Sequence, residues 1–398
     1  MLIKGEYGTA VIHAAIVDDT TKEQVKELMN QKFVKDLNVR IMPDCHAGKG
    51  CVIGTTMNVV NSCVPNLVGV DIGCGMFTVE LGKMNINLEQ LDNYIKENIL
   101  SGENIYEENQ EYNTNIRFME CYDKLKHKKR FDRSIGTLGG GNHFIEIDKD
   151  EDDNLYLIIH SGSRNLGVQV CEHYMDIAEN NLKHKRHNEI HELATQMKKE
   201  GKVQLIQKEI DKIMHKYSLI NKSLLPLYGT EFKNYLHDMN ICQEYAKENR
   251  ERIATKILNY LGLKLTDFEH FHTIHNYINM TDKMLRKGAI SAYKGEKVLI
   301  PINMRDGAII GMGKSNKDYN YSAPHGAGRI ISRQQAKKRI TMEDYRKSME
   351  GIYSSCVCKS TIDESPFVYK SINAILPNIL ETIDIVKIIK PIYNFKAK

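Results

Sequence analysis

The feature that most constrains the fold is a long helical stretch, about residues 170–262, between two regions with a strand pattern. The segments KVQLIQKEIDKIMHKY and NICQEYAKENRERIATKILNYL place apolar residues three and four apart among lysine and glutamate, which is the spacing of amphipathic helices. Residues 1 to about 80 alternate short apolar runs with glycine-rich turns, and this pattern returns from about residue 273. Such runs are typical of buried strands that end in loops.

These patterns predict an α+β protein, a single domain over residues 1–398 with a helical excursion at about 170–262. The runs VLIPIN and GAIIGMG predict two further strands, and the segment SINAILPNILETIDIVKII predicts a final helix. The sequence has no internal repeat and no proline- or serine-rich linker. One domain with the helices set into it is therefore the simplest organisation.

Composition and charge exclude some classes of protein. The chain is 41% hydrophobic and 27% charged with a net charge of +4, a mildly basic balance that permits a nucleic-acid partner without requiring one. We find no signal-peptide pattern and no run of eighteen apolar residues, so we expect no membrane span. Nine cysteines without disulfide-framework spacing favour the reducing cytoplasm.

Unusual polar residues fall at turns that follow the apolar runs. A single histidine beside a strand is more often a structural residue, but repetition of one context favours function, because strand ends that open into glycine turns display functional groups. The candidates are Asp44 and His46 in MPDCHAGKG, Asp71 and Cys74 in GVDIGCGM, His143 in GTLGGGNHFIE, His160 in LIIHSGSR, His275 in HTIHNY, and His325 in SAPHGAGR.

The turn DIGC carries the strongest metal signal. Asp71 and Cys74 lie three apart on a glycine-bearing turn, so both can reach one cation, and a thiolate can bridge two. Sulfur disfavours Mg²⁺, whereas Mn²⁺, Fe²⁺, Co²⁺ and Zn²⁺ accept a mixed set of cysteine, histidine and aspartate. Histidines 143, 160 and 275 would complete such a set. The alternative is that Cys74 is a small buried core residue.

The stretch SAPHGAGR places His325 between a proline and two glycines, with an arginine close behind. Glycine lets the backbone approach a ligand, glycine-rich amides bind phosphate, and arginine forms bidentate pairs with phosphate oxygens. The pattern predicts a histidine that contacts a phosphate.

Four other motifs do not support a functional site. GAIIGMGKSN is not a phosphate-binding loop, because Ala308 stands where the first glycine is required. HNEIH, residues 187–191, has its glutamate in the wrong place for a zinc protease and lies in a lysine-rich helix, so a solvated face is expected. CVC at 356–358 has no second cysteine pair nearby. The basic run at 123–130 is a solvated face unless other evidence supplies RNA.

The motifs MPDCHAGKG, GVDIGCGM, GTLGGGNHFIE, HSGSR, HNY, RKGA and HGAGR, in this order, resemble those of the RtcB-type RNA ligases. The resemblance runs from about residue 40 to the C-terminus. It implies the family's α+β fold, with central β-sheets and outer helices. It also implies ligation, with GTP and two Mn²⁺ ions, of RNA 3′-phosphate or 2′,3′-cyclic phosphate ends to 5′-hydroxyl ends, in RNA repair or tRNA splicing.

The resemblance further implies a role for each matching residue. His325 would be the nucleophile that carries GMP, Asp44 an active-site carboxylate and Arg164 a phosphate-binding residue. The implied ligands of the two metal ions are Asp71, Cys74, His143, His160 and His275. The implied nucleotide contacts are Asn142, Glu146, Gly326, Ala327, Tyr369 and Lys396.

The chain also departs from the family. It reads PINMRDG at residues 301–307 where many members read PGSMG, which sets Arg305 and Asp306 in a loop that normally passes near the nucleotide. Three other functions stay open at this point. They are an RNA 3′-end capping nucleotidyltransferase, a binuclear metal phosphoesterase and a non-catalytic RNA-binding scaffold.

Overall fold

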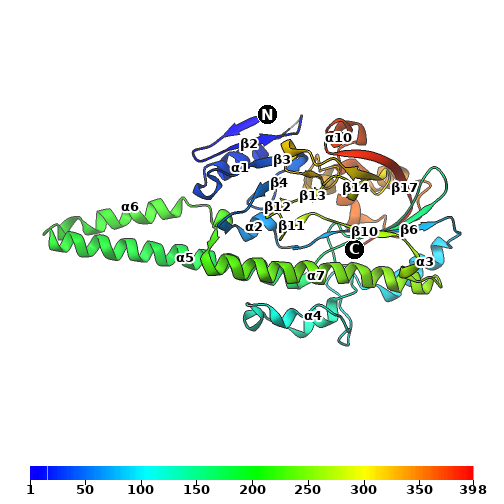
Figure 1. Ribbon diagram of the computed structural model, residues 1–398, viewed down its shortest axis with the longest axis horizontal. Coiled ribbons are helices and arrows are strands. Elements are labelled where there is room, and N and C mark those ends of the chain that lie inside the picture. Colours follow the sequence, from blue (N-terminus) through cyan, green and yellow to red (C-terminus); the bar gives the residue numbers. More distant parts are fainter. Residues whose placement is uncertain (16, 398) are drawn as a thin grey trace.

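The computed structural model describes residues 1–15 and 17–397, and two large β-sheets form its centre (Figure 1). The first sheet has six strands in the order β1-β2-β3-β4-β12-β11. Only β2 and β3 pair in parallel; the other neighbours are antiparallel. The strands are β1 (Leu2–Lys4), β2 (Thr9–Ile12), β3 (Val39–His46), β4 (Ile53–Asn58), β11 (Asn276–Ile278) and β12 (Met284–Lys287).

The second sheet has seven strands in the order β10-β6-β8-β7-β17-β15-β14, all antiparallel to their neighbours. Its strands are β6 (Gly75–Gly82), β7 (Phe144–Lys149), β8 (Leu155–Ser161), β10 (His270–Ile274), β14 (Lys297–Asn303), β15 (Gly307–Gly313) and β17 (Ile383–Lys396). Two small sheets pair β13 (Ala289–Ser291) with β16 (Ser322–Pro324) and β5 (Ser62–Cys63) with β9 (Leu227–Tyr228).

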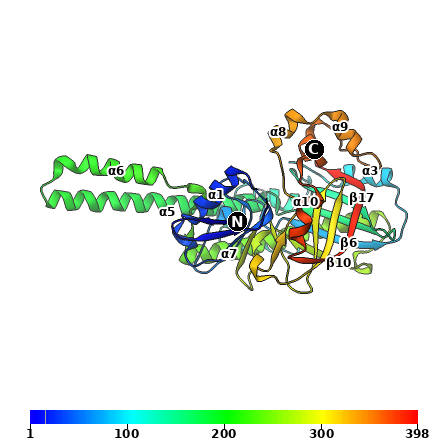
Figure 2. The same ribbon diagram turned by 90° about the horizontal axis from the view of Figure 1, so that it is seen from above.

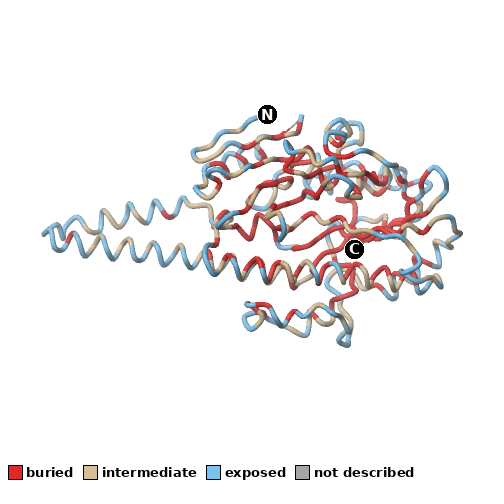
Figure 3. The backbone as a smooth tube through the Cα atoms, in the orientation of Figure 1, coloured by how far each residue is buried: buried red, intermediate tan, exposed pale blue. Residues whose placement is uncertain are grey.

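Three long helices form the predicted helical excursion. They are α5 (Arg164–Lys199), α6 (Ile206–Ser218) and α7 (Gly229–Tyr260). Helix α7 packs on β6 and β8, where Ile253 and Ile257 join the apolar cluster of the second sheet with Phe77 and Leu157. The outer half of α5 and α6 form an exposed hairpin that projects from the body (Figures 1 and 3). The predicted α+β fold is confirmed.

The shorter helices lie around the sheets. They are α1 (Asp19–Met29), α2 (Pro65–Val68), α3 (Leu88–Asn98), α4 (Lys129–Ser134), α8 (Arg333–Arg339), α9 (Met342–Ser348) and α10 (Ile372–Ile379). Helix α1 was not among the predicted elements, although Asp18 caps it by accepting a hydrogen bond from the Thr21 amide, a recognisable start signal. Among the described residues, no helix combines the length and the apolar character needed to cross a membrane.

The prediction of one helix over residues 371–389 is wrong in its second half. Helix α10 ends at Ile379, and strand β17 begins at Ile383. Burial alternates along the start of β17, where Ile383 and Ile385 are buried or half-buried and Asp384 and Val386 are exposed, and β-branched residues in a period of two favour a strand. Because β17 pairs with β7, Asn394 lies opposite Glu146 and Lys396 lies opposite Phe144.

Candidate active site and metal centre

The ends of three neighbouring strands bring the predicted metal ligands together. Cys74 directly precedes β6, His160 lies near the end of β8, and His275 directly follows β10. Strand β6 pairs with both of the others, with Gly75 opposite Ser161 and opposite Ile274. Since antiparallel neighbours place the start of one strand beside the end of the next, ligands that are distant in the sequence meet at one edge of the sheet.

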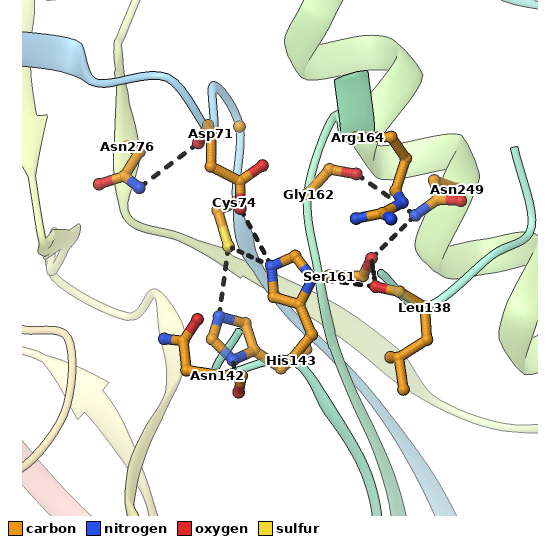
Figure 4. A network of polar contacts seen from close by, with 12 residues as sticks. Asp71, Cys74, Leu138, Asn142, His143, Ser161, Gly162, Arg164, Asn249 and Asn276 are labelled. Carbon is orange, nitrogen blue, oxygen red and sulfur yellow. Dashed lines mark hydrogen bonds and ion pairs between the residues drawn. The ribbon is translucent and has the colours of Figure 1, made fainter. Parts of the chain in front are cut away.

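The ligand atoms form two sets that share one sulfur. Cys74 Sγ lies 3.4 Å from His143 Nε2 and 3.3 Å from His160 Nε2, and His143 Nε2 lies 3.0 Å from Asp71 Oδ2 (Figure 4). One set is Cys74, His160 and His275, and the other is Asp71, Cys74 and His143. Within each set the ligand atoms lie within 4.8 Å of one another. The structure therefore brings all five predicted ligands to one place.

The chemistry of these donors fits transition-metal ions. Nδ1 of His143 lies 2.9 Å from the Leu138 carbonyl and Nδ1 of His160 lies 3.2 Å from the Asn142 carbonyl. A proton on each Nδ1 satisfies these carbonyls and leaves the Nε2 lone pair for a cation. A thiolate, imidazoles and a carboxylate suit Mn²⁺, Fe²⁺, Co²⁺ or Zn²⁺.

The pKa values of the ligands also favour a metal ion at this site. Burial holds the pKa of His160 and of His275 well below the usual value, and neighbouring histidines add to the effect, so both rings are neutral. Burial also raises the pKa of the Cys74 thiol well above its usual value, with a contribution from the Asp71 carboxylate. A thiolate at this position therefore needs a cation beside it, which is how metal binding and deprotonation become linked.

Two buried residues of α7 support the metal-binding turns from behind. Arg250 donates from Nη1 to the carbonyls of Gly73 (2.7 Å) and Ser161 (2.8 Å), the neighbours of Cys74 and His160. Asn249 donates to Ser161 Oγ at 3.0 Å (Figure 4). Both residues lie in the predicted helical region, but the sequence did not assign them this role. The available signal was an Asn-Arg pair on the same helix face as Ala246 and Ile253, which are both buried.

A carboxylate holds His325 beside this cluster. Oδ2 of Asp44, a fully buried residue at the end of β3, lies 2.7 Å from His325 Nδ1 and accepts the backbone N–H groups of His325 (3.1 Å) and Gly326 (3.3 Å). The His325 ring centroid is 5.0 Å from that of His275. A carboxylate at Nδ1 fixes the proton there and leaves Nε2 with a free lone pair. The sequence predicted an active-site carboxylate at this position but not its partner.

A cavity of about 430 Å³ opens on the cluster and on His325. All predicted nucleotide contacts line it together with four of the five predicted metal ligands. The lining residues of this kind are Asp71, Cys74, His160, His275, Asn142, Glu146, Gly326, Ala327, Tyr369 and Lys396. The structure thus places the predicted nucleotide contacts and the predicted nucleophile around one space.

Glu364 organises one wall of this cavity, and the sequence did not identify it. Lys396 Nζ donates to Glu364 at 2.9 Å and the Tyr369 hydroxyl donates to the same carboxylate. Arg329 and Arg333 lie 3.3 Å and 2.7 Å from it. Burial acts to raise the pKa of Glu364, but the charges of Lys396 and Arg333 outweigh it and lower the pKa to about 2. The carboxylate therefore stays ionised and anchors four side chains.

Glu146 on β7 is the other buried carboxylate of the cavity. It accepts a hydrogen bond from Asn394 of β17. Burial raises its pKa to about 7, although the Asn394 bond and the charge of Lys396 oppose the shift. Folding thus favours the protonated form, so ionisation of Glu146 destabilises the folded chain as the pH rises from about 4.5 through 7.

We therefore predict a pH-dependent stability gain for Glu146→Gln, which keeps the Asn394 bond and cannot ionise. At pH 8.5 the Tm of the variant is expected to exceed that of the wild type by about 2 °C or more, and at pH 4.5 the two should coincide. Thermal unfolding at both pH values measures this difference. A difference that is the same at both pH values would show that packing, not ionisation, is responsible.

Arg164 lines a second cleft instead of the nucleotide cavity. It begins α5 with φ of 57° and donates to Thr137 Oγ1 and to the Gly102 carbonyl, each at 3.2 Å. The cleft has a volume of about 700 Å³ and meets the nucleotide cavity at Asp71. Both acceptors are uncharged, and within residues 1–15 and 17–397 Arg164 forms no ion pair with a carboxylate, so its charge remains available for an anion in the cleft.

The predicted basic run forms one wall of this second cleft. Lys124, Lys126 and Arg130 line it. The side chain of Gln169 on α5 accepts from the Lys126 amide at 2.7 Å and donates to the Lys126 carbonyl at 3.1 Å. This amide clamp holds the run against α5, in the same cleft as Arg164.

The departure at residues 301–307 leaves the cavity uncharged at that point. Arg305 and Asp306 pair with each other through two contacts of 2.8 Å and 3.0 Å. The loop presents Ile302, Asn303 and Met304 to the cavity, and the charged pair is not part of the lining.

The fold and the site together define a class of protein. Antiparallel strand ends gather a thiol, imidazoles and a carboxylate around positions for transition-metal ions, next to a histidine held by a buried carboxylate. Such a donor set beside a polarised histidine is typical of metal-dependent enzymes.

Comparison with known proteins identifies the family. The family model for tRNA-splicing ligase RtcB matches residues 24–117 and 101–397, and the chain therefore belongs to the RtcB family, as the motifs predicted. It is 27% identical to the RNA-splicing ligase RtcB of Escherichia coli K12, over 96% of this chain and 95% of that protein. It is 25% identical to the tRNA-splicing ligase RtcB of Methanococcus maripaludis, over 83% of this chain and 82% of that protein. It is also 25% identical to the tRNA-splicing ligase RtcB of Aeropyrum pernix, over 84% of this chain and 82% of that protein.

Proposed function

We propose that this chain is a GTP-dependent RNA ligase that joins 3′-phosphate or 2′,3′-cyclic phosphate ends to 5′-hydroxyl ends, in RNA repair or tRNA splicing. The names of its relatives support RNA ligation. The observation that carries the proposal is the contact of 2.7 Å between Asp44 and His325 at the wall of a cavity that also contains metal ligands. This arrangement suits a nucleophilic histidine better than a structural one.

In the first step, His325 Nε2 would attack the α-phosphorus of GTP. The N–P bond forms as the bond to pyrophosphate breaks, which leaves GMP on the imidazole as a phosphoramidate. The Asp44 carboxylate accepts a hydrogen bond from the proton on His325 Nδ1, so the proton stays on that nitrogen. The same carboxylate stabilises the positive charge that develops on the imidazole ring. The Gly326 amide already points at Asp44, and the missing side chain at this position lets the phosphate approach.

Two Mn²⁺ ions would be held by the two ligand sets, with Cys74 common to both. When bound, such ions neutralise the charge on phosphate oxygens and on the leaving pyrophosphate.

Four side chains would recognise the nucleotide. Glu146 and Lys396 would bond the guanine edge and Tyr369 would pack on the base, while Asn142 would contact phosphate. Glu364 supports this assignment, because it already holds Tyr369 and Lys396 at the cavity wall.

In the later steps the GMP would pass from His325 to the RNA 3′-phosphate, after hydrolysis of a cyclic end where one is present. The 5′-hydroxyl then attacks the activated phosphorus, and GMP leaves. Arg164, Lys124, Lys126 and Arg130 would bind RNA phosphates in the second cleft, which meets the nucleotide cavity beside the metal ligands.

Product analysis tests the proposal against its alternatives. The chain is incubated with GTP, Mn²⁺ and two RNA strands, one ending in a 3′-phosphate and one beginning with a 5′-hydroxyl. A joined strand is the expected product. Accumulation of an RNA with a 3′-terminal GMP cap and no joined strand would indicate a capping nucleotidyltransferase. Loss of the 3′-phosphate without nucleotide transfer would indicate a phosphoesterase.

We predict that Asp44→Asn slows guanylylation of His325 by about a hundredfold or more, because a neutral amide no longer stabilises the imidazolium or fixes its tautomer. The rate of label transfer from α-labelled GTP measures the effect, with bound metal quantified in the same samples. A wild-type rate in a variant that retains its metal would remove Asp44 from the mechanism.

A further inference from the structure

The outer part of the α5–α6 hairpin, residues 183–222, forms a projection that we call the basic arm. Figures 1 and 2 show it extending from the body in two perpendicular views, and Figure 3 shows that most of its surface is exposed. The two helices pack chiefly on each other, with Met197 and Tyr217 as the buried side chains of the arm. Because the arm contributes little to the sheet cores, stabilisation of the fold does not explain its presence.

The arm has a higher net positive charge than the whole chain. Residues 183–222 contain ten lysine or arginine residues and five aspartate or glutamate residues, a net charge of +5, whereas the net charge of the full sequence is +4. Four histidines (His184, His187, His191 and His215) also lie on it. The net charge of the rest of the chain is close to zero, so the arm accounts for the net positive charge of this protein.

Half of these positive side chains form no ion pair with a carboxylate in the part of the chain that the structure describes. Lys183, Lys202, Lys212, Lys216 and Lys222 each pair with a glutamate. The other five form no ion pair within 4.0 Å in the described part of the chain; they are Lys185, Arg186, Lys198, Lys199 and Lys208. Exposed like charges on a narrow projection repel each other, and a polyanion removes that repulsion.

One continuous helix connects the arm to the candidate active site. Helix α5 has 36 residues, which corresponds to a length of about 54 Å. Its first residue is Arg164, in the cleft beside the metal ligands, and Lys198 and Lys199 lie at its last turn. The arm is therefore held at a set distance from the place where RNA ends would be joined.

We propose that the basic arm binds the sugar-phosphate backbone of structured RNA at a distance from the ends being joined. This inference rests on the proposed function for the identity of the polyanion. Lysine and arginine bind phosphates without reading sequence, and a rigid helical arm suits a stem better than a short flexible strand. The arm would thus favour broken RNAs that keep a folded body.

Binding measurements test this without requiring catalysis. The arm variant replaces Lys185, Lys198, Lys199 and Lys208 with glutamine. The control variant replaces Lys4, Lys26, Lys32 and Lys35 with glutamine, so it loses the same charge as the arm variant. These four lysines are exposed residues of the N-terminal region and form no ion pair among the described residues. The probes are a stem–loop RNA with a stem of about 16 base pairs and a single strand of about 8 nucleotides.

The arm variant is expected to bind the stem–loop about tenfold more weakly than the control variant, with a salt slope reduced by up to about 0.9 for each RNA phosphate that is no longer neutralised. The two variants should bind the short strand equally. Equal affinity for the stem–loop would overturn the inference. Labelling of His325 from GTP is measured on the same samples. Stem–loop binding that depends on the arm in a protein that takes no label would contradict the proposed ligase mechanism and leave the arm inference standing.

Discussion

Replacement of His325 by alanine is expected to abolish transfer of label from α-labelled GTP to the protein, a loss of at least about a thousandfold. The reason is that His325 is the imidazole whose Nδ1 is held by the Asp44 carboxylate, which leaves its Nε2 lone pair for attack on phosphorus. The measurement is acid-labile label on the denatured chain after incubation with GTP and Mn²⁺, with ATP in a parallel reaction.

Loss of label must be separated from loss of structure. His325 is partly exposed, so the alanine variant should keep the wild-type Tm and metal content. Label that persists in the variant would exclude His325 as the attachment site. Label from ATP instead of GTP would keep the histidine chemistry and contradict the assignment of guanine contacts to Glu146 and Lys396.

Replacement of Cys74 by alanine is expected to weaken binding of both metal ions by about a hundredfold or more, because its sulfur belongs to both ligand sets. Titration with Co²⁺ provides a direct measurement, since a cobalt–thiolate bond gives a charge-transfer absorption that the variant should lack. Label transfer from GTP is expected to fall in parallel.

Cys63→Ala is a matched control, because Cys63 is a fully buried thiol in the core cluster of the first sheet and is not a member of either ligand set. It should keep the cobalt absorption and both binding events. If the Cys74 variant bound two Co²⁺ ions with wild-type affinity, the sulfur would not be a ligand, and the alternative of a small core cysteine would be correct.

Much of the fold could be predicted because it depends on local patterns. Apolar spacing of three and four located the helical region, and short apolar runs beside glycine located most of the strands. The exception is β17. Its isoleucine-rich sequence follows α10 without a glycine, so the apolar pattern of the helix runs on into it, and pairing with β7 and β15 fixes the segment as a strand.

The residues of the candidate site were predictable where a local sequence feature marks them. Cys74, His160 and His275 each stand beside a glycine turn or at the end of an apolar run, a local feature that the sequence displays. Glu364 and Arg250 have no such signal, since what distinguishes them is the set of groups that converge on them from distant segments. Burial without compensating contacts would be costly for either charge, and the contacts exist only in the folded chain.

Residue identity alone establishes which chemical groups are available: a shared thiol, imidazoles at strand ends and a histidine between a proline and glycines. Folding sets their geometry, because antiparallel pairing of β6 with β8 and β10 brings the ligands within bonding distance of common positions. Folding also brings Asp44 to His325, 281 residues further along the chain. Contacts of this kind depend on the packing of whole sheets, whereas residue spacing reports only the neighbours within an element.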